Sequence, residues 1–321
     1  MARNWNDMPN EVKFMIVDKM DIFTRTKLKM CSKSDKCIVE SVPLHLDYLD
    51  VECKPHRKMF LIDNFNIRTG KNGKFSKNID GESYPFKLPK KLEKYKTKYL
   101  FKKFVVSLLL PGNLNMGYFI TDLDFPNKLS NTTIDTKAVC FNSDSEEIKK
   151  WIKILSPKVK SICIHDKVKH LLEGIGLIPV IINAEELHIV TRPVEACVRK
   201  NDVTNEQLLT FKFTKGYIKK SKITKDGAVQ FIQNMRHRDY PFDTDIVIHV
   251  VRNTRAPRHR ERLDEHQREV RHCLPMNSEK EVVYYYNPLE YRFSIYVQEA
   301  GGPVQTYNER FGETDDEMED I

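Results

Sequence analysis

Apolar residues near the start of the chain follow the period of a helix rather than that of a strand. When residues 12–20 are placed on an ideal helix, apolar side chains surround most of its circumference, and only Lys13, Asp18 and Lys19 interrupt them. A helix that is apolar on most sides must be buried on more than one face. A segment of about forty residues rarely folds alone. We therefore expect the remaining apolar face to be covered by the rest of the chain or by another protein.

Turn and capping residues divide this segment into three short helices. Pro9 suits the first turn of the first helix, where a missing N–H costs little, and Pro43 ends the segment. The residues whose side chains can cap the helix starts are Asn6 or Asp7, Thr24, and Ser32 or Ser34. The sequence therefore predicts a small module of three helices that stops near Pro43.

Beyond this module the apolar pattern changes to alternation, which is typical of strands. A strand is predicted from Leu44. The apolar run 60–67 predicts a second strand, and Asn72-Gly73 is a strong hairpin turn signal before a third strand from Phe75. The segments 60–67 and from Phe75 onward are expected to pair in a small antiparallel sheet.

The second half of the chain alternates between helix and strand patterns. A stripe formed by Ile148, Trp151, Ile152 and Leu155 predicts an amphipathic helix over residues 146–155. Further strands are predicted over residues 105–110, 159–164, 186–190, 208–213, 245–251, 282–286 and 291–297, and further helical segments near 168–172 and after Thr224. Strand starts recur at intervals of roughly 20 to 40 residues, as in stacked repeats. The predicted fold class is α+β, in which the helical module precedes a mixed α/β domain or a degenerate leucine-rich-repeat-like array.

Two parts of the chain resemble a known family. The first has the order Met-Pro-x-Glu-Val-x3-Ile-x3-Met over residues 8–20 and Leu-x2-Cys-Ser-Lys over residues 28–33, and it resembles an F-box. The Cys-Ser-Lys variant is similar to that of the large nematode group of F-box proteins, although Asp35 stands near the place where the family often has a tryptophan. The second part, residues 186–190 and 222–232, resembles the F-box-associated domain of the same group.

The resemblance implies a protein that joins a Skp-type adaptor, and through it a cullin scaffold, to a target protein, without bond chemistry of its own. It implies an F-box over residues 1–43 and an F-box-associated substrate-recruiting domain over residues 44–300. Residues 301–321 are acidic and lack the apolar surface needed to fold, so a disordered acidic tail is expected there. The residues that match the adaptor-binding positions of the motif are Met8, Pro9, Val12, Ile16, Met20, Leu28 and Cys31. Lys19 and Arg25 are expected at the rim of that interface, where charges tune the rate of association.

Composition agrees with an intracellular protein and excludes some other classes. The chain has 321 residues, 40% of them hydrophobic and 31% charged, as is ordinary for a soluble globular protein. No apolar run is long enough for a transmembrane helix, and charged residues interrupt any signal-peptide core at the N-terminus. The cysteines are odd in number and form no close CxxC pairs, which predicts reduced thiols in the cytosol or nucleus.

Net charge leaves a second function open. The formal charge is +8 and the pI is about 8.9, a balance that can indicate contact with nucleic acid. The most suggestive stretch is 90–104, in which lysines alternate with Tyr95, Tyr99, Phe101 and Phe104, a composition that can stack on bases and neutralise phosphates. A solvated amphipathic connector explains the same stretch. Nucleic-acid binding is therefore kept as the alternative function.

An arginine-rich stretch at residues 252–271 has a sharper potential role. Guanidinium groups form paired hydrogen bonds with carboxylates and phosphates, so the stretch could bind an acidic or phosphorylated target. The candidate target-binding residues are Arg252, Arg255, Arg258, Arg260 and Arg262. A solvated loop balanced by neighbouring acidic residues is the alternative interpretation.

The chain lacks the short motifs of common catalytic sites. There is no nucleophile elbow, P-loop, dinucleotide fingerprint or zinc-protease motif. Cys163, His165 and His170 lie close together in sequence, but no compact set of four ligands accompanies them, so no metal or cofactor is predicted. His188 and His249 are expected in strands as structural residues. Asp243 and Asp245 are expected to be solvated or to cap a strand.

Overall fold

The structure is a computed structural model of the chain. It describes residues 5–54, 58–63, 65–69, 75–79, 82–86, 90, 95–112, 114–143, 145–166, 178–191, 203–219, 222–251, 270–288 and 290–302. The chain divides into two compact units, Met1–Cys163 and Ile164–Ile321. None of the helices in the described part of the chain is both long enough and apolar enough to span a bilayer.

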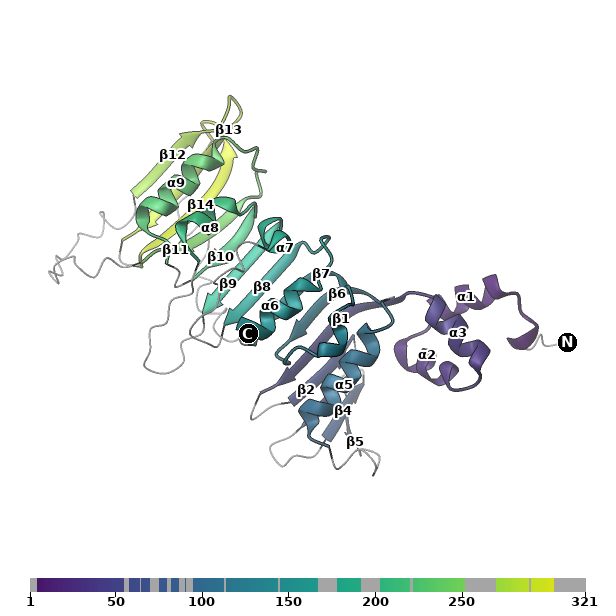
Figure 1. The fold of residues 1–321 in the computed structure, drawn as a ribbon. Coiled ribbons are helices and arrows are strands. Elements are labelled where there is room, and N and C mark those ends of the chain that lie inside the picture. The colour runs from purple at the N-terminus through teal and green to yellow at the C-terminus, as the bar shows by residue number, and fades with distance from the viewer. Residues whose placement is uncertain are drawn as a thin grey trace. The chain divides into compact units, whose positions relative to one another are not determined.

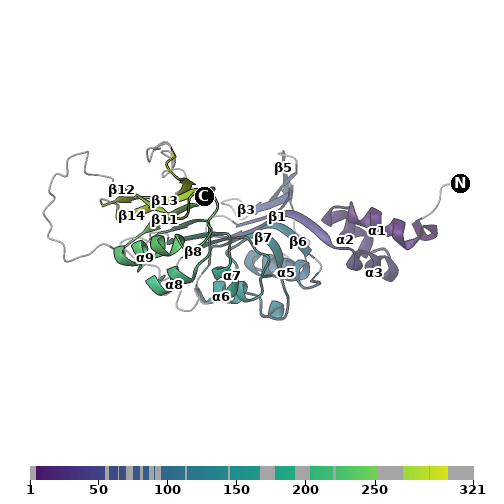
Figure 2. The same cartoon turned by 90° about the horizontal axis from the view of Figure 1, so that it is seen from above.

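The first unit consists of three short helices followed by a sheet with helices on one face (Figures 1 and 2). The N-terminal elements are η1 (Trp5–Asp7), α1 (Asn10–Asp18), α2 (Ile22–Lys29) and α3 (Lys33–Ser41). The following elements are β1 (Leu44–Cys53), β2 (Lys58–Ile62), β3 (Phe65–Thr69), β4 (Phe75–Ile79), β5 (Glu82–Phe86), α5 (Thr97–Leu109), β6 (Leu114–Thr121), η2 (Asn127–Leu129), β7 (Asp135–Phe141), α6 (Ser145–Lys153) and β8 (Ser161–Asp166). The division between the units falls within β8.

Strand β1 joins two kinds of sheet. On one side it pairs with β6 in parallel, and β6 pairs with β7 in parallel. On the other side β1 to β5 form an antiparallel meander. The core under the parallel strands is built around Trp151, which is fully buried and lies against the rings of Phe119, Phe125 and Phe141. Its indole N–H donates a 3.0 Å hydrogen bond to the Leu123 carbonyl, so the one polar atom of the ring is satisfied.

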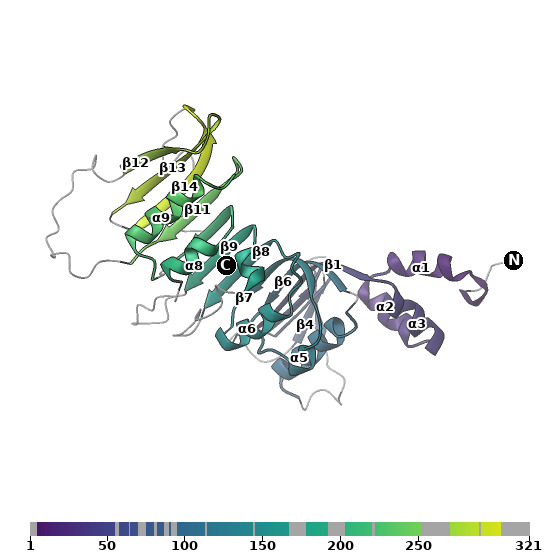
Figure 3. The same cartoon turned by 45° about the horizontal axis from the view of Figure 1, so that its top comes forward.

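The second unit repeats this layered arrangement. Its elements are α7 (Pro179–Ile182), β9 (Glu186–Thr191), α8 (Asn205–Thr210), β10 (Lys215–Ile218), α9 (Lys225–Met235), β11 (Asp245–His249), β12 (Val270–Pro275), β13 (Lys280–Asn287) and β14 (Arg292–Glu299). Strands β9, β10 and β11 are parallel, and β14, β13 and β12 continue the sheet antiparallel from β11. The helices lie on one face of these strands (Figure 3). Gly216 permits close packing here, because a Cβ at this position would lie 2.5 Å from the Leu187 carbonyl oxygen.

The predicted fold class is confirmed: three helices are followed by a mixed α/β region with a large sheet. Within each unit the parallel strands lie in sequence order, as in a repeat array. The helix over residues 146–155 is also confirmed, since Ile148, Trp151, Ile152 and Leu155 are all buried. Thr224 caps α9 by accepting a hydrogen bond from the Gly227 amide, as its position predicts.

Two predicted strands are wrong. Residues 105–110 belong to helix α5, in which Phe101, Val105 and Leu109 are buried at every fourth position. Residues 208–213 begin inside helix α8, which starts with a capping box between Thr204 and Gln207. Both errors have the same cause, because a short apolar run does not distinguish a buried strand from the buried stripe of a helix.

Several boundaries also differ from the predictions. The run 60–67 forms two strands, because the chain reverses at Asp63, whose φ is 47° and whose carboxylate accepts hydrogen bonds from two backbone amides of β1. Strands β6, β7, β10 and β12 were not predicted. The cap of α1 is Pro9 and that of α2 is Asp21, whereas Ser32 caps α3 as predicted. The turn at 72–73, the helical segment near 168–172 and the acidic tail from 303 lie outside the described residues.

Candidate functional site

The three N-terminal helices pack around a small apolar core. Val17, Ile38, Val39 and Val42 are buried in it, and Trp5, Met20 and Leu28 pack against it from the side. Asp21 starts α2 by accepting hydrogen bonds from the Phe23 and Thr24 amides, and its side chain also accepts one from the Thr24 hydroxyl, which is the first cause of the lowered pKa of Asp21. The helices are therefore fixed by capping as well as by apolar burial.

Arg25 connects the three helices through their backbone. Its side chain is almost completely buried, and the guanidinium donates hydrogen bonds to the carbonyls of Met20 at 3.2 Å, Val42 at 3.0 Å and Asp18 at 3.4 Å. These carbonyls lie at the ends of α1 and α3, where helices leave acceptors without partners. The prediction that Arg25 stands at an interface rim is therefore wrong, since its charge is used to satisfy backbone carbonyls inside the module.

Trp5 contacts helix α3 at Asp35, which stands near the place where the F-box family often has a tryptophan. Its indole N–H donates a 2.7 Å hydrogen bond to the carboxylate of Asp35, which also accepts a 2.7 Å hydrogen bond from the Ser32 hydroxyl. Lys13 is buried beside this pair, with its ammonium 5.7 Å from the centre of the indole ring. The hydrogen bond from Trp5, and secondly that from Ser32, hold the pKa of Asp35 below its ordinary value of 3.8. A tryptophan from the start of the chain thus packs against the third helix.

These contacts predict how the module responds to acid. The pKa of Asp35 is lower in the folded chain than its ordinary value, so its ionised carboxylate stabilises the fold at pH values above that ordinary pKa. This stabilisation is lost as the pH falls from about 4 through the folded pKa and the carboxylate is protonated. Asp35→Asn should therefore weaken the module slightly near neutral pH and remove this part of its acid sensitivity. Urea titrations at several pH values, followed by the indole N–H NMR signal of Trp5, measure the effect.

Asp7→Asn is the matched control, because Asp7 is exposed on η1. It should keep the pH dependence of the unchanged protein. Identical pH dependence of Asp35→Asn and the unchanged protein would show that the Trp5–Asp35 contact does not hold the module together.

The surface of α1 that faces away from the core is apolar. Met15 is 71% exposed, Val12 40% and Phe14 39%, and Met30, which follows α2, is 76% exposed. A shallow groove of about 410 Å³ adjoins α1, with Phe14 and Met15 on one side and Val42 and Pro43 on the other. A small module that exposes several large apolar side chains together has the surface of a protein-binding site.

The structure divides the residues predicted to bind an adaptor into two groups. Pro9, Val12 and Cys31 are exposed, and Met8 and Ile16 are half-buried. Met20 and Leu28 instead pack against the core of the module. Phe14, Met15 and Met30 are further exposed apolar residues that the motif positions do not include, and Met15 lies three residues from Val12 on the same helix face.

The other candidate residues contact neighbouring side chains where the structure describes them, although Tyr95, Tyr99 and Phe104 are also exposed. In the basic stretch, the rings of Tyr95 and Tyr99 stack 5.1 Å apart, and Lys103 lies 4.9 Å from the centre of the Tyr99 ring. A hydrogen bond with Tyr99 raises the pKa of Lys103. Phe101 is buried. These faces therefore contact one another, and no observation supports nucleic-acid binding.

The predicted structural residues of the second unit also have partners. Asp243 forms a 3.0 Å ion pair with Lys215, and this hydrogen-bonded contact lowers the pKa of Asp243. His188 lies 3.4 Å from the Glu186 carboxylate, and the ring of His249 meets that of Tyr217 edge to face. The five candidate arginines of the stretch 252–271, as well as His170, lie outside the described residues.

Comparison with known families agrees with the geometry of the helical module. The family model described as F-box domain matches residues 5–47, which include η1, all three helices and the start of β1. The N-terminal module is therefore an F-box domain, and F-box domains bind adaptors of the Skp type. No curated protein matches the chain, and no solved structure matches it either.

Proposed function

We propose that this chain is the substrate-recognition subunit of a Skp–cullin–F-box ubiquitin ligase. The observation that carries the proposal is the F-box module itself, with Val12 and Met15 exposed on α1 while Val17 and Arg25 hold the helices together. Fully burying a side chain of this size contributes about 1.5 to 3 kcal/mol. A few such side chains can offset the cost of association and leave useful affinity.

The remainder of the chain supplies the second half of the bridge. It has a large sheet with its own apolar cores, around Trp151 in the first unit and around Phe213 and Phe231 in the second. We further propose that this region corresponds to an F-box-associated domain of the nematode type and that it captures the target. The chain would then act by proximity, because holding a target lysine near a charged conjugating enzyme makes the transfer effectively intramolecular.

The proposed compartment is the cytosol or nucleus, where such ligases act. The odd number of cysteines in the sequence and the lack of close CxxC pairs are the basis of this proposal. The arginine-rich stretch stays a candidate for target binding.

Affinity purification of two forms of the chain tests the proposal. The intact chain should recover a Skp-type adaptor, a cullin and target proteins. A form carrying Val12→Asp and Met15→Asp should lose the adaptor and cullin but keep proteins bound by the sheet region. If the intact, folded chain recovers neither adaptor nor cullin, the proposed function is wrong.

A further inference from the structure

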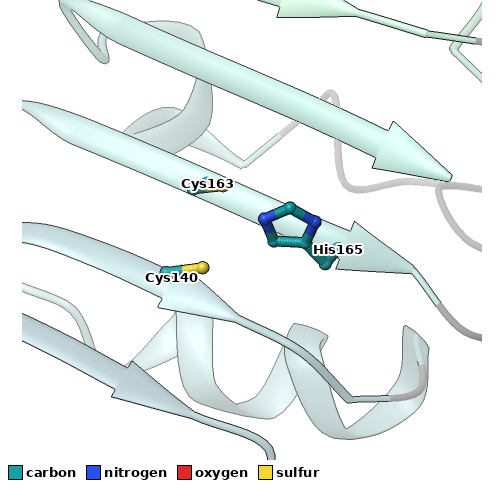
Figure 4. Close-up of side chains that lie close together, drawn as sticks. All are labelled: Cys140, Cys163 and His165. Atoms are coloured by element: carbon teal, nitrogen blue, oxygen red, sulfur yellow. The ribbon is translucent and has the colours of Figure 1, made fainter. Parts of the chain in front are cut away.

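Three side chains of the kinds that bind metals lie close together on two neighbouring strands. Cys140 lies on β7, and Cys163 and His165 lie on β8. One ligand atom from each residue can be chosen so that all three lie within 4.8 Å of one another, and all three residues are half-buried. Figure 4 shows the three side chains on the same face of the strands, with a helix behind them. Cys163 and His165 lie close together in the sequence, whereas Cys140 lies far from them.

The strands place these residues together because of their alternation. Successive side chains of a strand point to opposite faces. On β8, Ile162 and Ile164 are fully buried in the core, so Cys163 and His165 lie on the other face. On β7, Val139 and Phe141 are buried on either side of Cys140. The Lys160 amide donates a 2.9 Å hydrogen bond to the Lys137 carbonyl, which fixes the register of the two strands. Cys163 and Cys140 each lie three residues beyond this hydrogen-bonded pair, so they are neighbours across the strands.

We propose that Cys140, Cys163 and His165 bind a zinc ion. Two thiolates and an imidazole are the ligands that Zn²⁺ prefers, whereas Mg²⁺ and Ca²⁺ require oxygen ligands. Zinc holds such donors about 2.0 to 2.3 Å away in a tetrahedron, which puts neighbouring donors roughly 3.3 to 3.8 Å apart. The observed limit of 4.8 Å exceeds this range by roughly 1 to 1.5 Å, so the side chains must move closer together to bind the ion. Three protein ligands leave the fourth position of the tetrahedron for water or another ligand.

Such a site would connect β7 to β8 on the face away from the helices. The proposed zinc site is distinct from the F-box surface. Loss of zinc binding should therefore leave adaptor binding unchanged, and loss of adaptor binding should leave zinc binding unchanged. Zinc should bind the folded state and not the unfolded state, because the unfolded chain does not hold the three ligands together. Such binding stabilises the folded state. We therefore expect zinc removal to lower the unfolding temperature of the intact protein.

Cys53 provides a matched control for the two cysteine ligands. It is also half-buried on a strand, and its amide donates a 2.7 Å hydrogen bond to Asp122. Burial, followed by the charge of Asp122, raises the pKa of the Cys53 thiol to about 12. This thiol therefore stays protonated near neutral pH and is a poor metal ligand.

The test is metal titration of the full chain, purified with reductant and stripped of metal. Co²⁺ should bind one equivalent and give thiolate-to-metal absorption with the visible bands of a tetrahedral ion, and Zn²⁺ should displace it. Cys140→Ser, Cys163→Ser and His165→Gln should each lower the affinity by at least about 100-fold. Cys53→Ser should leave it unchanged. Absence of the cobalt bands, or their retention in Cys140→Ser, would overturn the proposal.

A second measurement uses the unchanged protein, so it does not depend on whether the variants fold. Bound Zn²⁺ should protect Cys140 and Cys163 from alkylation, as read by peptide mass spectrometry, while exposed Cys31 and Cys273 react equally with and without metal. A Cys140–Cys163 disulfide that forms on air oxidation, combined with no metal uptake by the reduced chain, would also overturn the proposal.

Discussion

Replacing Val12 and Met15 together with aspartate is expected to abolish adaptor binding while the chain stays folded. Both side chains are exposed on α1, and neither belongs to the core of the module, so the substitutions remove little packing. In a complex they would be covered, and two carboxylates would then be buried without partners, which is strongly unfavourable. We expect the affinity for a Skp-type adaptor to fall by at least about 100-fold, as for loss of central interface residues.

Surface plasmon resonance with immobilised adaptor measures this change, and circular dichroism checks the fold. The control is Leu110→Asp, which places one such charge on another exposed apolar residue, 52% exposed, directly after α5. The control should bind as the unchanged chain does. Equal loss in both variants would mean that added charge, rather than the α1 surface, reduces binding.

Arg25→Met is expected to destabilise the F-box module strongly by removing its buried guanidinium. Methionine keeps much of the volume of the side chain but cannot donate to the carbonyls of Asp18, Met20 and Val42. Each buried acceptor left without a donor costs about 1 to 3 kcal/mol, although water can satisfy part of the loss. We expect a total destabilisation of about 2 to 4 kcal/mol, which is comparable to the whole stability of a small module.

Urea titration followed by the indole N–H signal of Trp5 measures this loss, because Trp5 packs against the core of the module. The transition should move to a lower urea concentration in Arg25→Met. Lys27→Met, on an exposed position of the same helix, should leave it in place. An unchanged transition in Arg25→Met would show that the three hydrogen bonds contribute little.

The helical module could be predicted from the sequence because local signals agreed there. Helices were indicated there by the apolar period of residues 12–20, by Pro9 and by the Ser32 cap. The module has the three α-helices that these signals predicted. The roles of its charged residues could not be predicted. Arg25 and Lys13 are buried only because distant carbonyls and the Trp5 ring come close in three dimensions, and one-dimensional periodicity assigns both to the surface.

The sheet region shows the same limit in another form. Alternation predicted β9 and β11, and an apolar stripe predicted α6. Short apolar runs at residues 105–110 and 208–213 were misassigned as strands, because helix and strand can bury the same few residues. The grouping of Cys140 with Cys163 and His165 depends on which strands are neighbours, and that neighbour relation has no local signal.

The central claim is that the F-box module of this chain binds an adaptor directly. Isothermal titration calorimetry of the purified chain with a purified Skp-type adaptor tests it without any other component. We expect a 1:1 complex with a Kd at or below about 1 μM and a negative heat-capacity change from burial of the apolar α1 surface. A folded chain that gives no complex at tens of micromolar would contradict the account.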